Sequence, residues 1–196
     1  MVGRLAPWKG QHVFLEAFAR AFPAGGAGAD EGTRSAEALL VGSALFGEDD
    51  YVAALHAQVA DLGLEGRVRF TGFVDDVAAL LAEVDVVVHA SVVAEPFGQV
   101  VVEAMAAGRP VIASDLGGPA EVVTDGVDGL LSPAGDADAL AACLVRLADD
   151  AGLRLRLGRA AAATAHAYEP AVVAPRLVAV LAQVARSSRR RVARRR

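Results

Sequence analysis

The sequence contains few of the residues that build disulfides and zinc centres. Cys143 is the single cysteine among 196 residues. One cysteine cannot form a disulfide framework within the chain, and it cannot supply a zinc cluster by itself. Because Cys143 lies in the apolar stretch ALAACLVRLA, we expect it to be a small core side chain.

Basic residues are scarce until the last eleven positions. The net charge is −5, but seven arginines lie in RSSRRRVARRR (186–196), which leaves 12 basic against 24 acidic residues for the rest of the chain. An acidic body argues against nucleic acid as the main partner. We expect residues 186–196 to form a disordered, solvated tail, with weak contact to anionic lipid or RNA as the alternative.

Long apolar runs and targeting signals are also lacking. No uninterrupted apolar run reaches the roughly 18 residues that span a bilayer. The first residues carry no apolar core of a signal peptide. These absences predict a cytoplasmic protein, peripheral at the inner membrane face if the basic tail binds lipid. Hydrophobic residues still make up 54% of the chain, which is ample for a buried core.

What the sequence does have is an alternation of short β-branched runs with longer helical patterns. The valines of VDVVVHAS (84–91) are typical of a parallel strand covered on both faces. Strands are predicted over residues 1–4, 38–41, 68–70, 84–91, 111–114 and 130–132. Helices are predicted over 12–22, 50–62, 98–107, 119–123, 136–149, 153–167 and 171–185. Another helix, which Asp75 and Asp76 can cap, is predicted to end at Glu83. Residues 23–35 are predicted to form a glycine-rich loop. This order predicts an α/β fold over residues 1–185, a Rossmann-like, doubly wound parallel sheet of about six strands.

The first predicted strand begins abruptly, so we expect the chain to be part of a longer one. In open α/β sheets, ligands bind outside the carboxyl ends of the strands. Residues suited to binding follow these predicted ends: Gly3, Arg4, Lys9, Gly72, Ser91, Glu95, Gly117 and Gly118.

Two cations follow the first strand. Arg4 offers a planar fork for phosphate oxygens and Lys9, the only lysine, offers a compact charge, so together they suit a diphosphate. The alternative is that both are ordinary surface cations.

Two carboxylates lie eight positions apart in AEPFGQVVVEAMAAGRPVIAS (94–114). Glu95 precedes Gly98 at the predicted start of a helix, where unpaired N–H groups favour phosphate. Glu95 can therefore reach sugar hydroxyls, while Glu103, farther along the helix, can accept hydrogen bonds from a ribose. Alternatively, Glu95 is a partner of the helix dipole and Glu103 a partly exposed helix residue.

These segments resemble the retaining glycosyltransferases of family 4. GRLAPWKG, the stretch from Ala94 to Ser114 with its Glu-x7-Glu spacing, GGPAEVV and DGVDGLL occur in that family's order. The resemblance covers nearly the whole chain and matches the C-terminal, nucleotide-sugar-binding half of the two-lobed GT-B fold. It implies that the N-terminal acceptor domain is absent here.

The resemblance implies a role for each matching residue. Arg4 and Lys9 would bind the donor diphosphate and stabilise the leaving group, and Glu95 would hold the donor sugar; these three are the expected catalytic residues. The expected donor-binding residues are Gly3, Gly72, Phe73, Ser91, Phe97, Gly98, Gln99, Val100 and Glu103. Glu103 would bind the ribose, and Gly72 and Phe73 would lie beside the base. Ala90 and Gln99 depart from the family's common proline and leucine.

The resemblance also implies what the reaction uses. The donor is a nucleotide-diphosphate sugar, and the acceptor, whether glycan, lipid or small molecule, is left open. No cofactor or metal is expected, because protein cations would stabilise the leaving charge. Asp136 and Asp138 form the only Asp-x-Asp, which a helix cap explains better than a metal site. His89 is expected to be a packed polar group rather than a catalyst.

Three functions remain compatible with these residues. The first is a glycosyltransferase lobe acting with retention of configuration. The second is an inert nucleotide-sugar-binding module, and the third is a nucleotide-sugar epimerase on the same fold, since function depends on the site rather than on the fold.

Overall fold

A computed structural model describes residues 1–23 and 36–193, so most of the predicted loop 23–35 lies outside the described residues. Along the chain the elements are η1 (Pro7–Lys9), α1 (Gln11–Ala21), β1 (Ala38–Val41), α2 (Asp49–Asp61), β2 (Val68–Gly72), α3 (Val77–Glu83), β3 (Val87–His89), α4 (Gln99–Ala106), β4 (Val111–Ser114), α5 (Gly117–Val122), β5 (Leu130–Ser132), α6 (Ala137–Asp149), α7 (Ala151–Ala165), η2 (His166–Tyr168) and α8 (Pro170–Ala193). The predicted alternation of strands and helices is confirmed.

The strands form two parallel groups rather than one continuous ladder. β1 pairs with β2, and β3, β4 and β5 pair in that order. The predicted first strand is reduced to a parallel bridge between Val2 and Val41. The expected sheet of about six strands is therefore five strands plus this bridge in the described part of the chain. The strand predicted over 84–91 is shorter than expected, because only Val87–His89 pairs with β4.

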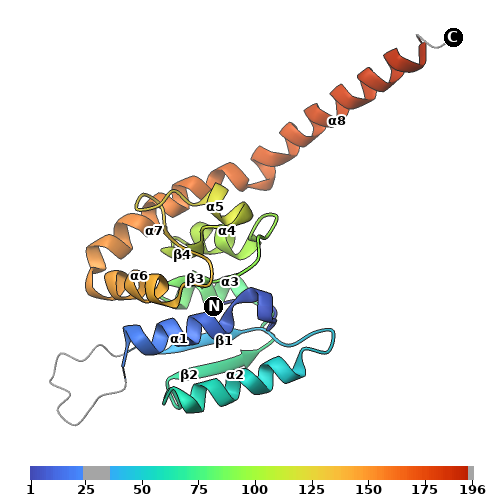
Figure 1. Cartoon of the computed structure of the whole chain (residues 1–196). Coiled ribbons are helices and arrows are strands. Elements are labelled where there is room, and N and C mark those ends of the chain that lie inside the picture. The colour runs from blue at the N-terminus through green and yellow to red at the C-terminus, as the bar shows by residue number, and fades with distance from the viewer. Residues whose placement is uncertain (24–35, 194–196) are drawn as a thin grey trace.

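Helices cover the strands in two packed clusters (Figure 1). One cluster joins α1, α2 and α6 to the strands, with Phe14, Leu40 and Ile112 among its buried side chains. The other lies between β3, β4, α4 and α7, around Met105 and Ala161. β3 and β4 are buried along their whole length, as the valine-rich pattern of residues 84–91 predicts for that part of the sheet.

Aspartates begin several helices. Asp76 accepts a hydrogen bond from the N–H of Ala79 at the start of α3. Asp136 accepts hydrogen bonds from the N–H groups of Asp138 and Ala139, so the Asp-x-Asp is a helix cap, as predicted. Cys143 is half-buried and packs against the first cluster.

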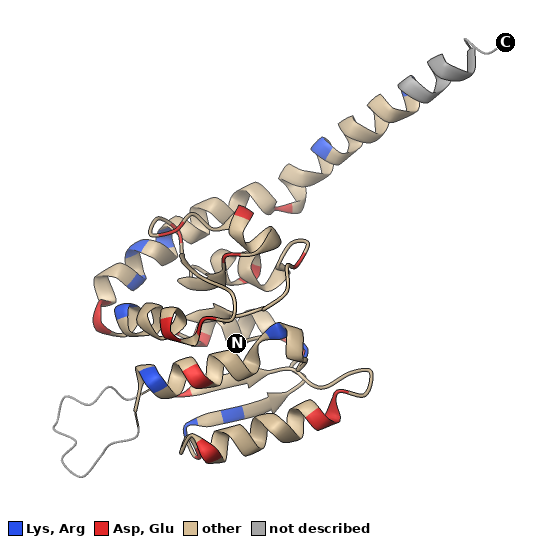
Figure 2. Ribbon diagram, viewed as in Figure 1, with Lys and Arg blue, Asp and Glu red and all other residues tan. Residues whose placement is uncertain are grey.

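The C-terminal helix corrects one expectation. α8 continues to Ala193, whereas a disordered tail was expected from residue 186; arginine is a good helix former, so the basic run need not end a helix. In addition, Ala151–Arg186 is long and apolar enough to cross a membrane by length and composition, although it has no uninterrupted apolar run of that length. α8 projects away from the body and carries few charges in its described part (Figures 1 and 2).

Candidate functional site

The segment after the Val2–Val41 bridge carries both predicted cations. The Arg4 guanidinium lies 5.3 Å from the ring centroids of both Trp8 and Phe46, and its Nε is 3.6 Å from Oε2 of Glu48. The Lys9 ammonium lies 4.4 Å from the Trp8 ring. Both cations therefore lie against one indole, as cation–π attraction favours.

Lys9 also joins the loop that follows β3. Its Nζ donates a hydrogen bond to Oε1 of Glu95 over 2.8 Å, and their side chains are only 16% and 12% exposed. The N–H of Val92 donates to the carbonyl of Trp8 at 2.9 Å, which holds the two loops together. The structure thus brings two of the three predicted catalytic residues into contact across 86 positions of sequence.

Three donors converge on the same oxygen of Glu95. Besides Lys9, His89 Nε2 lies 2.9 Å from Oε1, and the Ser91 hydroxyl donates to it. Within the described residues, no donor contacts Oε2, the other oxygen. The carboxylate is therefore fixed by one oxygen and can accept a hydrogen bond from a ligand through the other.

This arrangement keeps Glu95 ionised. Burial alone would raise the pKa of its carboxyl group, but hydrogen bonds from His89, Lys9 and Ser91 together lower the pKa from 4.5 to about 2. Hydrogen bonds to the charged form have this effect because they stabilise the anion more than the neutral acid.

His89 is a packed polar group, as expected, and the structure adds the partner that it contacts. It is 4% exposed at the end of β3 and contacts Glu95 directly, while its Nδ1 is buried without a hydrogen-bond partner. Sequence reasoning also did not select Trp8, Phe46 and Glu48, which surround Arg4. The position of His89 at a predicted strand end indicates that it lies near the site, but not that it contacts Glu95.

Glycines let three backbone segments meet around the loop that carries Glu95. A Cβ on Gly10 would lie 2.0 Å from the carbonyl oxygen of Ala90, and one on Gly117 would lie 2.4 Å from that of Glu95. The N–H of Gly118 donates to the same Glu95 carbonyl at 2.8 Å. Gly117 and Gly118, which the sequence analysis selected, therefore pack directly against the backbone of the loop that carries Glu95.

Substitution of Gly118 tests this support. A Cβ there would lie 2.4 Å from Cα of Phe97, a backbone atom that cannot move without the loop. We expect Gly118→Ala to lower the free energy of unfolding by about 1–3 kcal/mol through overpacking. Gly152 lies at the equivalent second position of α7, and a Cβ there would lie near side-chain atoms only. Gly152→Ala should therefore change the free energy of unfolding by less than about 1 kcal/mol. Urea denaturation of both variants measures the difference, and equal values would contradict this role of Gly118.

The start of α4 has the features expected of an anion site. Gly98 is its N-cap at φ 74°, and no side chain caps this end. The N–H groups of Gln99 and Val100 belong to the first turn, which leaves them without intrahelical partners. The Gln99 side chain donates to Oε1 of Glu103 at 2.6 Å, so the two predicted residues lie on one helix face.

The remaining predicted residues lie at the edges of this region. Phe97 is 42% exposed, with its ring centroid 5.7 Å from that of Tyr168. Gly72 accepts a hydrogen bond from the N–H of Gly42 at 2.8 Å, and Phe73 beside it is 77% exposed. No contact joins Phe73 to Glu95 or Lys9 within the described residues. Gly3 lies by the Lys9 side chain, where a Cβ would lie 3.8 Å from Cε.

The site therefore offers cations after the Val2–Val41 bridge, a fixed carboxylate in the loop after β3, and unpaired amides at the start of α4. Among the described residues, no group of three or more His, Cys, Asp or Glu side chains could hold a metal ion. Such a set of groups can bind a ligand that carries both phosphate and hydroxyl groups.

Comparison with known proteins gives a consistent result. A profile of the family described as "Glycosyl transferases group 1" matches residues 1–150. The lipopolysaccharide core biosynthesis glycosyltransferase LpsE of Rhizobium meliloti is 36% identical over 158 residues, 80% of this chain and 41% of that protein.

Solved structures show the same relationship. The Anabaena protein Alr3699/HepE in complex with UDP is 39% identical, with a TM-score of 0.85, over 93% of this chain and 47% of that one; the same protein has also been solved with UDP-glucose. The C-terminal domain of the group 1 glycosyl transferase LpcC from Francisella tularensis is 28% identical, with a TM-score of 0.71, over 83% of this chain and 80% of that one. The chain spans less than half the length of LpsE and of HepE.

Proposed function

The chain belongs to the glycosyl transferases of group 1, and on this premise we propose that it is the donor-binding lobe of a retaining enzyme of family 4. In this proposal residues 1–185 form the C-terminal lobe of a GT-B fold, and a separate N-terminal lobe binds the acceptor. The likeness to an isolated C-terminal domain, of which 80% is covered, supports this assignment.

One observation carries the proposal: the hydrogen bond of Lys9 to Glu95 at the start of α4. It places a cation for phosphate beside a carboxylate for sugar hydroxyls. Lys9 has three N–H donors and uses one on Glu95, so the others can reach phosphate oxygens. Oε2 of Glu95 has no donor within the described residues and can accept from the donor sugar.

The rest of the donor then follows the elements around this pair. The diphosphate would lie between Arg4, Lys9 and the amides of Gly98, Gln99 and Val100. Glu103, held by Gln99, would accept from the ribose hydroxyls. The base would lie toward Gly72 and Phe73, and the UDP complexes of the 39% identical Anabaena protein support uracil as the base.

The proposed chemistry uses these charges. Breaking the bond from sugar to diphosphate develops positive character on the sugar and negative charge on the leaving group. Arg4, Lys9 and the first amides of α4 would stabilise that negative charge, an effect worth several kcal/mol when the groups are preorganised. In this scheme the protein cations take the part of a metal ion, and the product keeps the anomeric configuration of the donor.

Calorimetry with UDP, GDP and ADP on the full chain tests donor binding. We expect UDP to bind, because the cations and amides lie within this chain. Failure of all three nucleotides to bind would contradict the proposal. We expect the chain to turn over poorly alone; co-incubation with an acceptor lobe and analysis of the product's anomeric configuration would test retention.

We also propose that the protein works in the cytoplasm, at the inner membrane face. The described part of α8 exposes Leu177, Val178, Val180, Leu181 and Val184, and arginines follow from residue 186. Apolar side chains beside basic residues favour anionic lipid surfaces. Co-sedimentation should therefore be stronger with vesicles containing anionic lipid than with neutral vesicles, and equal sedimentation would contradict this location.

A further inference from the structure

The loop after β1, residues 43–48, holds an aromatic side chain to which the proposed donor site gives no role. Phe46 is 89% exposed, and its φ angle is 60°. Among the residues that the structure describes, it is the only one other than glycine with a positive φ. In this conformation the Cβ of an L-residue comes too close to the following carbonyl oxygen, so the loop keeps Phe46 there at a cost in stability. Strained residues of this kind cluster at ligand-binding sites, and the residue that Phe46 contacts belongs to the proposed donor site.

The Phe46 ring lies against Arg4. Its centroid is 5.3 Å from the guanidinium carbon, within the range of cation–π attraction. Glu48, from the same loop, forms an ion pair with the Nε of Arg4 at 3.6 Å and accepts a hydrogen bond from the N–H of Leu45 at 3.3 Å. Trp8 supplies a second ring at 5.3 Å from the guanidinium. Two residues of the loop therefore hold the Arg4 side chain, and one of them is itself fixed by the loop backbone.

The backbone of Arg4 is held by the chain that leads into this loop. The N–H of Gly3 donates to the carbonyl of Val41 at 2.9 Å, and the N–H of Leu5 donates to the carbonyl of Ser43 at 3.0 Å. The residues on both sides of Arg4 are thus bonded to the end of β1 and the start of the loop. Because one segment holds both the backbone and the side chain of Arg4, the loop can fix the direction of the guanidinium.

These contacts leave the outer edge of the guanidinium available. A guanidinium has five N–H donors, and Glu48 pairs with the Nε. Within the described residues, no ion pair engages the two Nη groups of Arg4. The Lys9 ammonium lies 4.4 Å from the centroid of the Trp8 ring, which Arg4 also contacts, so both cations lie at the same indole. The Nη groups can therefore form the planar fork that binds phosphate oxygens, next to the charge of Lys9.

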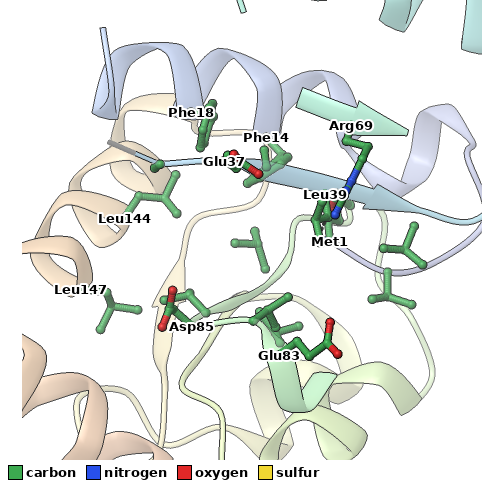
Figure 3. Close-up of a pocket in the computed structure, with 18 of the residues that line it drawn as sticks. Met1, Phe14, Phe18, Glu37, Leu39, Arg69, Glu83, Asp85, Leu144 and Leu147 are labelled. Atoms are coloured by element: carbon green, nitrogen blue, oxygen red, sulfur yellow. Dashed lines mark hydrogen bonds between the residues drawn. The ribbon is translucent and has the colours of Figure 1, made fainter. Parts of the chain in front are cut away.

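Arg4 and its contacts lie outside the large pocket of the structure. That pocket, of about 770 Å³, lies between the two strand groups, with Phe14 and Leu147 among its lining residues (Figure 3). The lining includes neither Arg4 nor the three residues around it, Trp8, Phe46 and Glu48. A diphosphate can therefore reach the Arg4 guanidinium from the surface, where this side chain is 26% exposed.

We propose that Phe46 is a positioning residue for Arg4, which it holds, together with Glu48, in the orientation that binds the donor diphosphate. This role rests on the proposed function, because Arg4 is assigned there to the diphosphate. A direct contact of the exposed ring with the nucleotide is the competing explanation, and the contact of the ring with the guanidinium favours positioning. Phe46 therefore acts on affinity through Arg4, and its effect disappears when Arg4 is removed.

Three variants of the full chain test this role by calorimetry with UDP. Phe46→Leu removes the aromatic face but keeps a Cβ at the same φ, and Phe46→Tyr keeps both. We expect Phe46→Leu to weaken UDP binding about two- to fivefold, as an exposed cation–π contact predicts, and Phe46→Tyr to bind like the wild type. Leu45→Ala is the matched control, because it truncates an exposed apolar side chain of the same loop, and it should also bind like the wild type.

A double-mutant cycle separates positioning from direct contact. In the Arg4→Ala background, Phe46→Leu should cause no further loss of affinity, because the group that the ring holds is gone. The Nε–H resonance of Arg4, assigned by its loss in Arg4→Ala, should shift in Phe46→Leu without nucleotide and keep its place in Phe46→Tyr. Both measurements respond to the contact between ring and guanidinium rather than to the stability of the loop.

The outcomes distinguish this role from the proposed function. Equal losses from Phe46→Leu with and without Arg4 would overturn the positioning role and assign the ring to the nucleotide itself. UDP binding by the wild type, with unchanged binding or an unchanged Arg4 resonance in Phe46→Leu, would overturn the role and leave the proposed function intact. Failure of the wild type to bind UDP, GDP and ADP would contradict the proposed function, and the role of Phe46 with it.

Discussion

Lys9→Ala is expected to weaken the binding of UDP by about 10- to 100-fold. A hydrogen bond from a charged group contributes about 1.5–3 kcal/mol, which corresponds to such a change in Kd. The upper end of this range is expected for Lys9→Ala, because the substitution also removes the cation that pairs with Glu95. The unpaired carboxylate would then repel the incoming diphosphate. Calorimetry at constant ionic strength measures the effect.

Two further variants separate the site from general electrostatics. Arg159→Ala removes an exposed cation on α7 and should leave the affinity within about twofold, since exposed charges are screened. Lys9→Arg keeps the charge but replaces a compact ammonium by a planar fork, so it should recover only part of the affinity. Equal binding by wild type and Lys9→Ala would remove Lys9 from the proposed donor site.

The sequence predicted the fold through its local patterns. Val111–Ser114 and Leu130–Ser132 were predicted with their observed bounds, because short β-branched runs between turn residues have few alternatives. The separation into two strand groups was not predictable in this way. In the described part of the chain the predicted first strand is only a bridge from Val2 to Val41, and no local pattern indicates that β1 and β3 do not pair with each other.

The site was predicted as a set of residues but not as a network. Lys9 and Glu95 were selected for separate ligand groups, whereas in the structure they contact each other. His89 was assigned to packing, since one histidine at the end of a buried strand gives no indication of its partner. Its contact with Glu95 depends on the turn of residues 90–95, which the glycines at 10, 117 and 118 permit by close backbone approach.

Glu95 should make the stability of the protein depend on pH in the acidic range. Its pKa in the folded protein, about 2, lies below the ordinary value of 4.5, so the folded state binds this proton less tightly than the unfolded state. The contribution to stability is therefore complete above about pH 4.5 and is lost as the pH falls toward about 2. A shift of this size corresponds to roughly 3 kcal/mol over the whole range.

Glu95→Gln should remove this dependence. Between about pH 7 and pH 3, the wild type should lose roughly 2 kcal/mol more free energy of unfolding than the variant, as measured by urea denaturation at each pH. Glu16→Gln is the matched control: its carboxylate is 42% exposed in a surface pair with Arg20, so its pH dependence should follow the wild type. Parallel pH curves for wild type and Glu95→Gln would show that the three hydrogen bonds do not hold the carboxylate as an anion. A protonated Glu95 would have to donate one of its hydrogen bonds instead of accepting it. The proposed role of Glu95 as a fixed acceptor for the donor sugar would then lose its physical basis.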